Sequence, residues 1–172
     1  MQTTILILGM GILAVIAYGD VRTRRIPNVL SLAIAILGLL RIILDHDPVA
    51  MGHTLAAATA IFIAAFLLFW YGGIGGGDTK LVAATALLVG YHDLFSFLFL
   101  MSACGGALAL AVLARDRLSR RRWLPTRRER EPLTTETAER IATPARPTTV
   151  PYGVAIAAAG VVTLILNAPF AR

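Results

Sequence analysis

Residues 53–90 read HTLAAATAIFIAAFLLFWY, then GGIGGGD, then TKLVAATALLVG: two apolar runs joined by a glycine cluster that ends in Asp78. The first run is long enough to cross a bilayer, because about 20 helical residues span a hydrocarbon core of about 30 Å. Glycine is poor helix material and lets other backbone come close. An aspartate near a bilayer is costly, which marks Asp78 as a candidate functional residue.

The same apolar character extends over most of the chain. Only 15% of the 172 residues are charged, against about 25% in soluble domains, and the mean hydropathy is +0.74. Further apolar segments cover residues 3–18, 28–44, 94–114 and 151–167. We therefore predict an all-α, polytopic membrane helical bundle of about six transmembrane helices, forming a single domain over residues 1–172.

Residues 79–90 make a short segment, and two structures remain open for it. Either the glycine-rich stretch dips into the membrane, or the helix continues through Tyr91, His92 and Asp93. Residues 115–150 differ in kind, since they hold 10 of the 16 Lys and Arg residues. We predict a basic cytoplasmic loop there, with a possible extension of the fifth helix to about Trp123.

The distribution of basic residues predicts the orientation, because Lys and Arg concentrate in cytoplasmic loops. With the N-terminus outside a plasma membrane, 14 of the 16 basic residues fall inside, and only Arg41 and Arg172 fall outside. Both Asp20 and Asp78 then face the cytoplasm, whereas the three histidines lie toward the other side. With one cysteine in the chain, Cys104, we expect no metal site and no cofactor. The loop's charge favours anionic lipid headgroups as its partner rather than nucleic acid.

Asp20 closes the first apolar run, and the predicted topology places it on the same membrane face as Asp78. Two nearby carboxyl groups in a poorly solvated site share one proton, and such a pair can activate water and polarise a peptide carbonyl. The alternative is that each aspartate is an interfacial charge in water. The glycines before Asp78 favour the first interpretation, because an extended substrate could lie beside them.

Three motifs resemble the type IV prepilin peptidases, aspartyl intramembrane-cleaving enzymes with a GxGD motif. Gly75-Gly76-Gly77-Asp78 fits GxGD and continues as Thr79-Lys80-Leu81; residues 20–28 read DVRTRRIPN, like the family's first-aspartate motif; residues 151–156 read PYGVAI, like the start of its last helix. The resemblance covers nearly the whole chain except residues 115–150. Without the Cys-x-x-Cys pair of larger members, the chain resembles the short, peptidase-only branch that serves Flp/Tad-type pili.

The resemblance implies a membrane aspartyl endopeptidase that removes the N-terminal leader from prepilins or pseudopilins at the cytoplasmic face. Asp20 and Asp78 would be catalytic, with the assignment of base and acid left open. Substrate-binding residues would be Gly75, Gly76, Gly77, Lys80 and Tyr152. The alternative function is a non-catalytic transporter or assembly scaffold that uses the aspartates as a cation or proton site.

Overall fold

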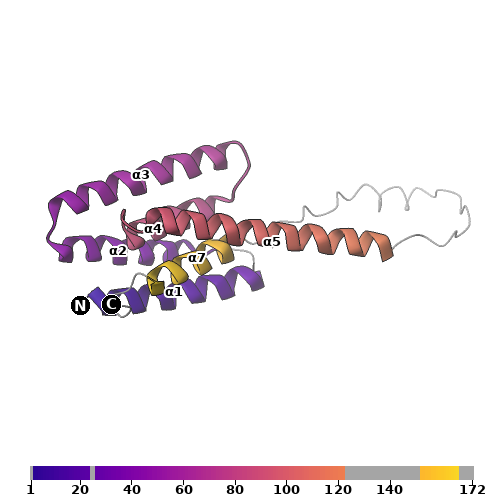
Figure 1. Cartoon of the computed structure of the whole chain (residues 1–172), viewed down its shortest axis with the longest axis horizontal. Helices are drawn as coiled ribbons and strands as arrows, with labels where there is room; N and C mark the ends of the chain where they lie inside the picture. The colour runs from indigo at the N-terminus through magenta and orange to yellow at the C-terminus, as the bar shows by residue number, and fades with distance from the viewer. Residues whose placement is uncertain (1, 24–25, 123–151, 167–172) are drawn as a thin grey trace, which may run out of the picture. The chain divides into compact units, whose positions relative to one another are not determined.

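The computed structural model describes residues 2–23, 26–122 and 152–166, and these ranges are helical apart from their turns. The helices are α1 (Gln2–Thr23), α2 (Asn28–Asp45), α3 (Pro48–Trp70), α4 (Gly76–Val89), α5 (Leu94–Arg122) and α7 (Tyr152–Leu166) (Figure 1). Four of them, α1, α2, α3 and α5, are long and apolar enough to cross a membrane. The predicted all-α membrane bundle is confirmed.

The chain forms two compact units, which we describe separately. One comprises residues 1–107 and 151–172, and the other comprises residues 108–150. In the second unit the structure describes the end of α5, which continues to Arg122, as the possible extension of the fifth helix predicted. The rest of the predicted basic loop, residues 123–150, lies outside the described residues.

Helix α4 is the centre of the first unit, because α2, α3 and α7 all pack along it. Two glycines allow this close packing. A Cβ on Gly38 of α2 would lie 2.8 Å from the Leu88 backbone nitrogen, and a Cβ on Gly160 of α7 would lie 2.8 Å from Thr85 Cγ2. Small residues at such interfaces let membrane helices approach closely and gain packing contacts.

The glycine cluster divides between a turn and a helix. Gly72, with φ +76°, lies in the turn after α3. Gly76 and Gly77 already belong to the first turn of α4, although glycine is a weak helix former. At the other end α4 stops at Val89, and Gly90 follows with φ +87°. The alternative in which this helix continues through residues 91–93 is therefore wrong, since those residues form a turn.

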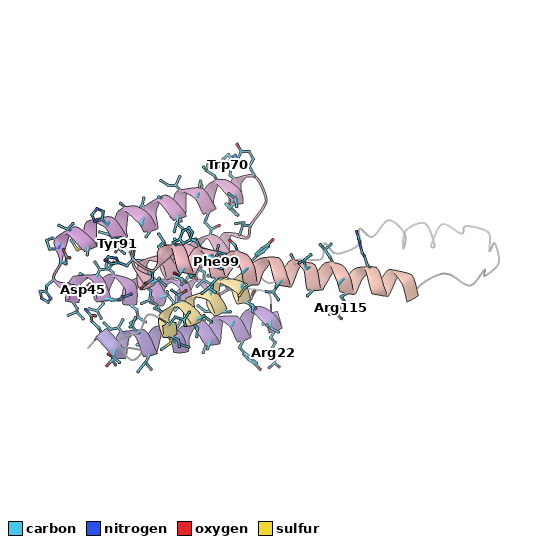
Figure 2. All side chains as sticks on the ribbon, viewed as in Figure 1. Arg22, Asp45, Trp70, Tyr91, Phe99 and Arg115 are labelled. Carbon is cyan, nitrogen blue, oxygen red and sulfur yellow. The ribbon has the colours of Figure 1, made fainter. Side chains whose placement is uncertain are left out.

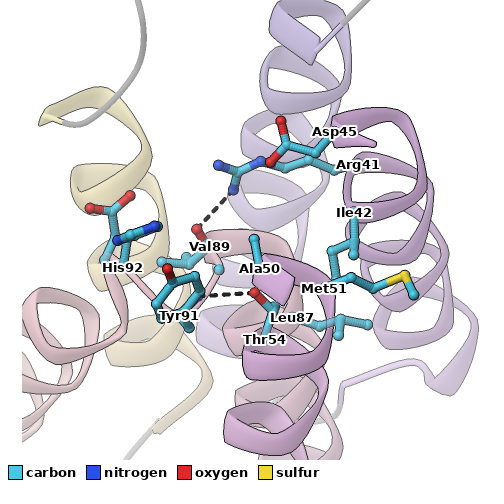
Figure 3. A pocket seen from close by; sticks show the side chains of 12 residues that line it. Arg41, Ile42, Asp45, Ala50, Met51, Thr54, Leu87, Val89, Tyr91 and His92 are labelled. Carbon is cyan, nitrogen blue, oxygen red and sulfur yellow. Dashed lines mark hydrogen bonds between the residues drawn. The ribbon is translucent and has the colours of Figure 1, made fainter. Parts of the chain in front are cut away.

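Arg41 closes the end of α4 that is remote from Asp78. Its Nη1 donates a hydrogen bond to the carbonyl oxygen of Leu88. It also donates to the carbonyl oxygen of Val89 at 2.8 Å, as Figure 3 shows. The last carbonyls of a helix have no partner within the helix, so this guanidinium supplies one. A cavity of about 110 Å³ at this end is lined by Arg41, Asp45 and His92 among others.

The two ends of the first unit differ in their polar residues. Gln2, at the start of α1, donates from Nε2 to Asp45 Oδ1 at 2.8 Å, which joins the start of α1 to the end of α2. Arg22 therefore lies at the opposite end from Asp45 and Tyr91 (Figure 2). Asp20, two residues before Arg22, belongs to the Arg22 end.

Candidate active site

Asp20 is a buried acidic residue near the end of α1, with 5% of its surface exposed. The backbone N–H of Val154 donates to Asp20 Oδ2 at 3.1 Å. Val154 lies in the first turn of α7, where the backbone N–H groups have no partner within the helix. The positive end of the helix dipole and this hydrogen bond stabilise a negative charge on Asp20.

Gly153 makes this contact between α1 and α7 possible. A Cβ at Gly153 would lie 2.7 Å from Asp20 Oδ2 and 2.9 Å from Ile26 Cδ1. Both distances are shorter than any ordinary contact of a Cβ atom, so any larger residue would displace the carboxylate or Ile26. In the sequence Gly153 is only one member of the PYGVAI motif, and no local pattern marks it as a site residue. Its effect depends on a contact with a residue 133 positions earlier.

Asp78 lies in the first turn of α4, outside the four long apolar helices, and its side chain is half-buried. Its carboxylate reaches back to the residue that precedes the helix and accepts a hydrogen bond from the Gly75 N–H. Burial and, to a smaller extent, the charge of Asp20 raise the pKa of Asp78, and the Gly75 hydrogen bond lowers it, so that the pKa is raised to about 6. Asp78 therefore holds its proton more tightly than an exposed aspartate.

Asp20 and Asp78 come together at one end of the first unit. Their charges interact, and Ile26 lies next to the backbone around both of them. Gly77 is the residue before Asp78, and a Cβ at Gly77 would lie 3.4 Å from Ile26 Cβ. The structure thus brings the two predicted catalytic residues to one place from helices that are far apart in the sequence.

The three glycines of the predicted substrate-binding set surround Asp78 closely. A Cβ at Gly75 would lie 3.1 Å from Asp78 Oδ2, and a Cβ at Gly76 would lie 3.3 Å from the ring of Phe69. At Gly77 the nearest atom would be Ile26 Cβ, at 3.4 Å. The space around Asp78 is therefore tight for side chains at residues 75 and 76 and closer to ordinary packing at residue 77.

The remaining predicted substrate-binding residues lie on different helices. Lys80 is exposed on α4, two residues after Asp78, and donates from Nζ to Asn28 Oδ1 at 3.3 Å. Tyr152 begins α7 and is 39% exposed. Its ring lies beside α5, because a Cβ at Gly105 would be 3.9 Å from Tyr152 Cε1.

The chemistry available at this site is that of two carboxyl groups. Among residues 2–23, 26–122 and 152–166, no group of three or more His, Cys, Asp or Glu side chains gathers as a metal site would require. One carboxyl group, Asp20, is buried and accepts a hydrogen bond from the backbone N–H of Val154. The other, Asp78, is held in surroundings that favour the protonated form. Such an unequal pair can take a proton with one member and give one with the other.

Comparison with known proteins supports the assignment made from the motifs. A profile of the type IV leader peptidase family matches residues 7–110. The chain belongs to the type IV leader peptidase family. It is also 31% identical, over 117 residues, to the prepilin leader peptidase/N-methyltransferase of Bacillus subtilis (strain 168). The similar region covers 67% of this chain and 47% of that relative, so the chain spans about half the length of the relative. No solved structure matches it.

The part of the chain that carries the family match includes both aspartates. Gly153 and Val154 lie after the matched residues, as does Tyr152. The contribution of α7 to the surroundings of Asp20 therefore emerges from the packing of this chain. The family match over residues 7–110 does not include α7 and so does not predict this contact.

Proposed function

We propose that this chain is a membrane aspartyl endopeptidase that removes the N-terminal leader from prepilins or pseudopilins. The observation that supports this most strongly is the pairing of Asp20 and Asp78 at one end of the bundle, where Asp20 accepts a hydrogen bond from α7 and its charge helps to raise the pKa of Asp78. The similarity to the prepilin leader peptidase/N-methyltransferase of Bacillus subtilis is the basis for the proposed substrate class.

The proposed roles follow from these surroundings. Asp20 acts as the general base, because the first turn of α7 stabilises its negative charge. Asp78 acts as the acid, because its raised pKa keeps a proton on it to higher pH. Asp20 takes a proton from water while the water oxygen bonds to the scissile carbonyl carbon, and Asp78 gives its proton to the carbonyl oxygen. When the C–N bond breaks, the amine takes the proton from Asp20, and the new carboxyl group returns one to Asp78.

The proposed substrate lies in extended form beside the glycines. Gly75, Gly76 and Gly77 have no side chains to separate the backbone of a peptide from the Asp78 carboxyl group. Lys80 of α4 and Tyr152 at the start of α7 would provide further contacts to the peptide. The chemistry needs no cofactor.

We further propose a multi-pass protein of the plasma membrane with its N-terminus outside. Arg22 lies at the Asp20 end of the first unit, and Arg41 lies at the other end among Asp45 and Asp93. An excess of Lys and Arg residues at one end of a membrane bundle is the expected sign of its cytoplasmic side. The active site would then open at the cytoplasmic face, with the anionic lipid headgroups of that leaflet as neighbours of the basic segment.

The test is co-expression with a candidate prepilin that has a basic leader, a glycine and an apolar helix. Wild-type protein should shorten the prepilin by the mass of its leader, as seen by mass spectrometry, and Asp78→Asn should leave it full-length. A transporter or scaffold would leave the prepilin uncut in both cases. That result, with protein present in the membrane, would refute the proposed function.

A further inference from the structure

A groove of about 600 Å³ lies between α2 and α3, with α4 as its floor. It exists because α2 and α3 each pack along α4 but touch one another little. Ala83 and Ala84 form part of the floor, and Leu32 and Phe62 belong to the two walls. We call this feature the α2–α3 groove. Its surface is mainly apolar, which suits an occupant that resides in a membrane.

One end of the α2–α3 groove is polar and lies next to the candidate catalytic pair. Lys80 and Asn28, which are joined by a hydrogen bond of 3.3 Å, both line it. Lys80 is two residues beyond Asp78, and Asn28 is two residues beyond Ile26. From Lys80 the lining continues along α4 to Leu87, a rise of about 10 Å for seven helical residues. The groove therefore leads away from the aspartates along α4.

Ser31 adds a polar group inside the α2–α3 groove. It is 4% exposed and lines the groove, and its Oγ is buried without a hydrogen-bond partner among the described residues. A buried polar group without a partner is unfavourable, so an occupant that supplies one gains by binding. Ser31 and the two alanines are also small, which lets a helix approach closely.

We propose that the α2–α3 groove binds the apolar helix that follows the scissile bond of the substrate, an inference that rests on the proposed function. In a bilayer this segment must be helical, because its backbone groups have no water to bond. The first N–H groups of a helix lack internal partners. Asn28 Oδ1 and Ser31 Oγ are acceptors at the end where that helix would begin, next to the aspartates. Lys80 Nζ can donate to carbonyl oxygens of the extended segment before it.

The test compares two substrates with the same leader and scissile bond. In the long substrate an apolar helix of about 20 residues follows the bond; in the short one only a single apolar turn and a soluble tail follow. Ala83→Leu fills the groove floor, and Ala64→Leu adds the same volume on the exposed surface of α3, outside the groove lining. The expected result is that Ala83→Leu lowers the ratio of kcat/KM for the long over the short substrate about tenfold, through KM, a loss of about 1.4 kcal/mol. Ala64→Leu should leave the ratio unchanged.

A crosslinking experiment measures occupancy without relying on turnover. Cys104→Ser removes the single cysteine of the chain. In that background with Asp20→Asn, Leu32→Cys should crosslink to a cysteine in the first turn of the long substrate's helix, and Ala64→Cys should not. Disulfide-linked homodimers through Leu32→Cys without substrate would overturn the proposal in favour of a second copy.

The outcomes separate this inference from the proposed function. If wild-type protein cleaves the long substrate while Ala83→Leu keeps the same ratio and Leu32→Cys gives no crosslink, the groove holds lipid and the inference is wrong, although the peptidase stands. If wild-type protein cleaves neither substrate, both proposals fall.

Discussion

Val154 donates its backbone N–H to Asp20 across 3.1 Å, which joins the first helix of the chain to the last one described. The contact gives Asp20 a hydrogen-bond partner that lies 134 positions away in the sequence. It also distinguishes the two aspartates, since Asp78 accepts from Gly75 within its own helix start. The proposed division into base and acid depends on this difference.

Asp20 and Asp78 should behave as one catalytic unit. Asp20→Asn and Asp78→Asn should each lower the rate of leader removal about 10²–10⁴-fold, the contribution expected of a general acid or base. The double variant should be no slower than the slower single variant, as for residues that act together. The rates are measured by mass spectrometry over time, with Asp93→Asn, near Arg41 at the other end, as the control. Near-normal turnover in Asp20→Asn would contradict the paired mechanism.

Gly153→Ala should reduce activity by displacing Asp20. The added Cβ would lie 2.7 Å from Asp20 Oδ2, and a misplacement of about 1 Å in a catalytic group can cost about 10²-fold in rate. We expect a fall of that size in kcat, measured with purified protein. Gly160→Ala is a matched control on the same helix, since its Cβ would meet Thr85 and Leu13 in the core instead. If both variants lost stability equally and kept their kcat, Gly153 would have only a packing role.

The raised pKa of Asp78 predicts a pH-dependent change in stability. A carboxyl group whose pKa is higher in the folded protein binds its proton more tightly there, so stability falls as pH rises from about 4 toward 6. Asp78→Asn cannot ionise, so its melting temperature relative to wild type should rise over this range and level off above it. In an Asp20→Asn background the same comparison should give a smaller change, because Asp20 contributes to the shift. A difference that is constant with pH would show that Asp78 titrates normally.

Arg41→Met should destabilise the bundle at the end of α4 remote from the aspartates. The guanidinium donates to the carbonyl oxygens of Leu88 and Val89, and a hydrogen bond to a charged group contributes about 1.5–3 kcal/mol. We expect a loss of that order, measured by thermal or denaturant unfolding in detergent. Arg22→Met is the control, because Arg22 Nη1 donates to the exposed Tyr18 hydroxyl at 3.2 Å. Equal losses in both variants would mean that closing the end of α4 adds nothing.

The proposed orientation can be checked with protease. Residues 120–122 are three consecutive arginines, so trypsin should cut there first in inside-out vesicles and should not reach them in intact right-side-out vesicles. The fragments are identified by mass spectrometry. Cleavage confined to right-side-out vesicles would reverse the topology and place the aspartates on the outer face. If the orientation holds, deletion of residues 127–146 should leave peptidase activity largely intact, since none of the proposed catalytic residues lies there.

Local sequence patterns were sufficient to predict the helices, but they predicted the first and last residues of each helix less well. The second apolar segment was predicted to start at residue 28, and α2 begins there, directly after Pro27. The third helix begins at Pro48, five residues before the apolar run at His53, because Asp47 accepts hydrogen bonds from the Val49 and Ala50 N–H groups. An apolar run marks the part of a helix that faces lipid or core, and its capped polar end extends beyond that run.

Composition and motifs alone were enough to predict a membrane helical protein and its family and to single out the two aspartates as candidates, because each of these is written in contiguous residues. Tertiary structure decided what those aspartates meet. Gly153 matters because α7 packs against Asp20, Arg41 matters because it reaches the last carbonyls of α4, and the α2–α3 groove exists because two helices share a third as a floor. Such contacts join residues that are far apart in the sequence, so a local sequence pattern does not predict them.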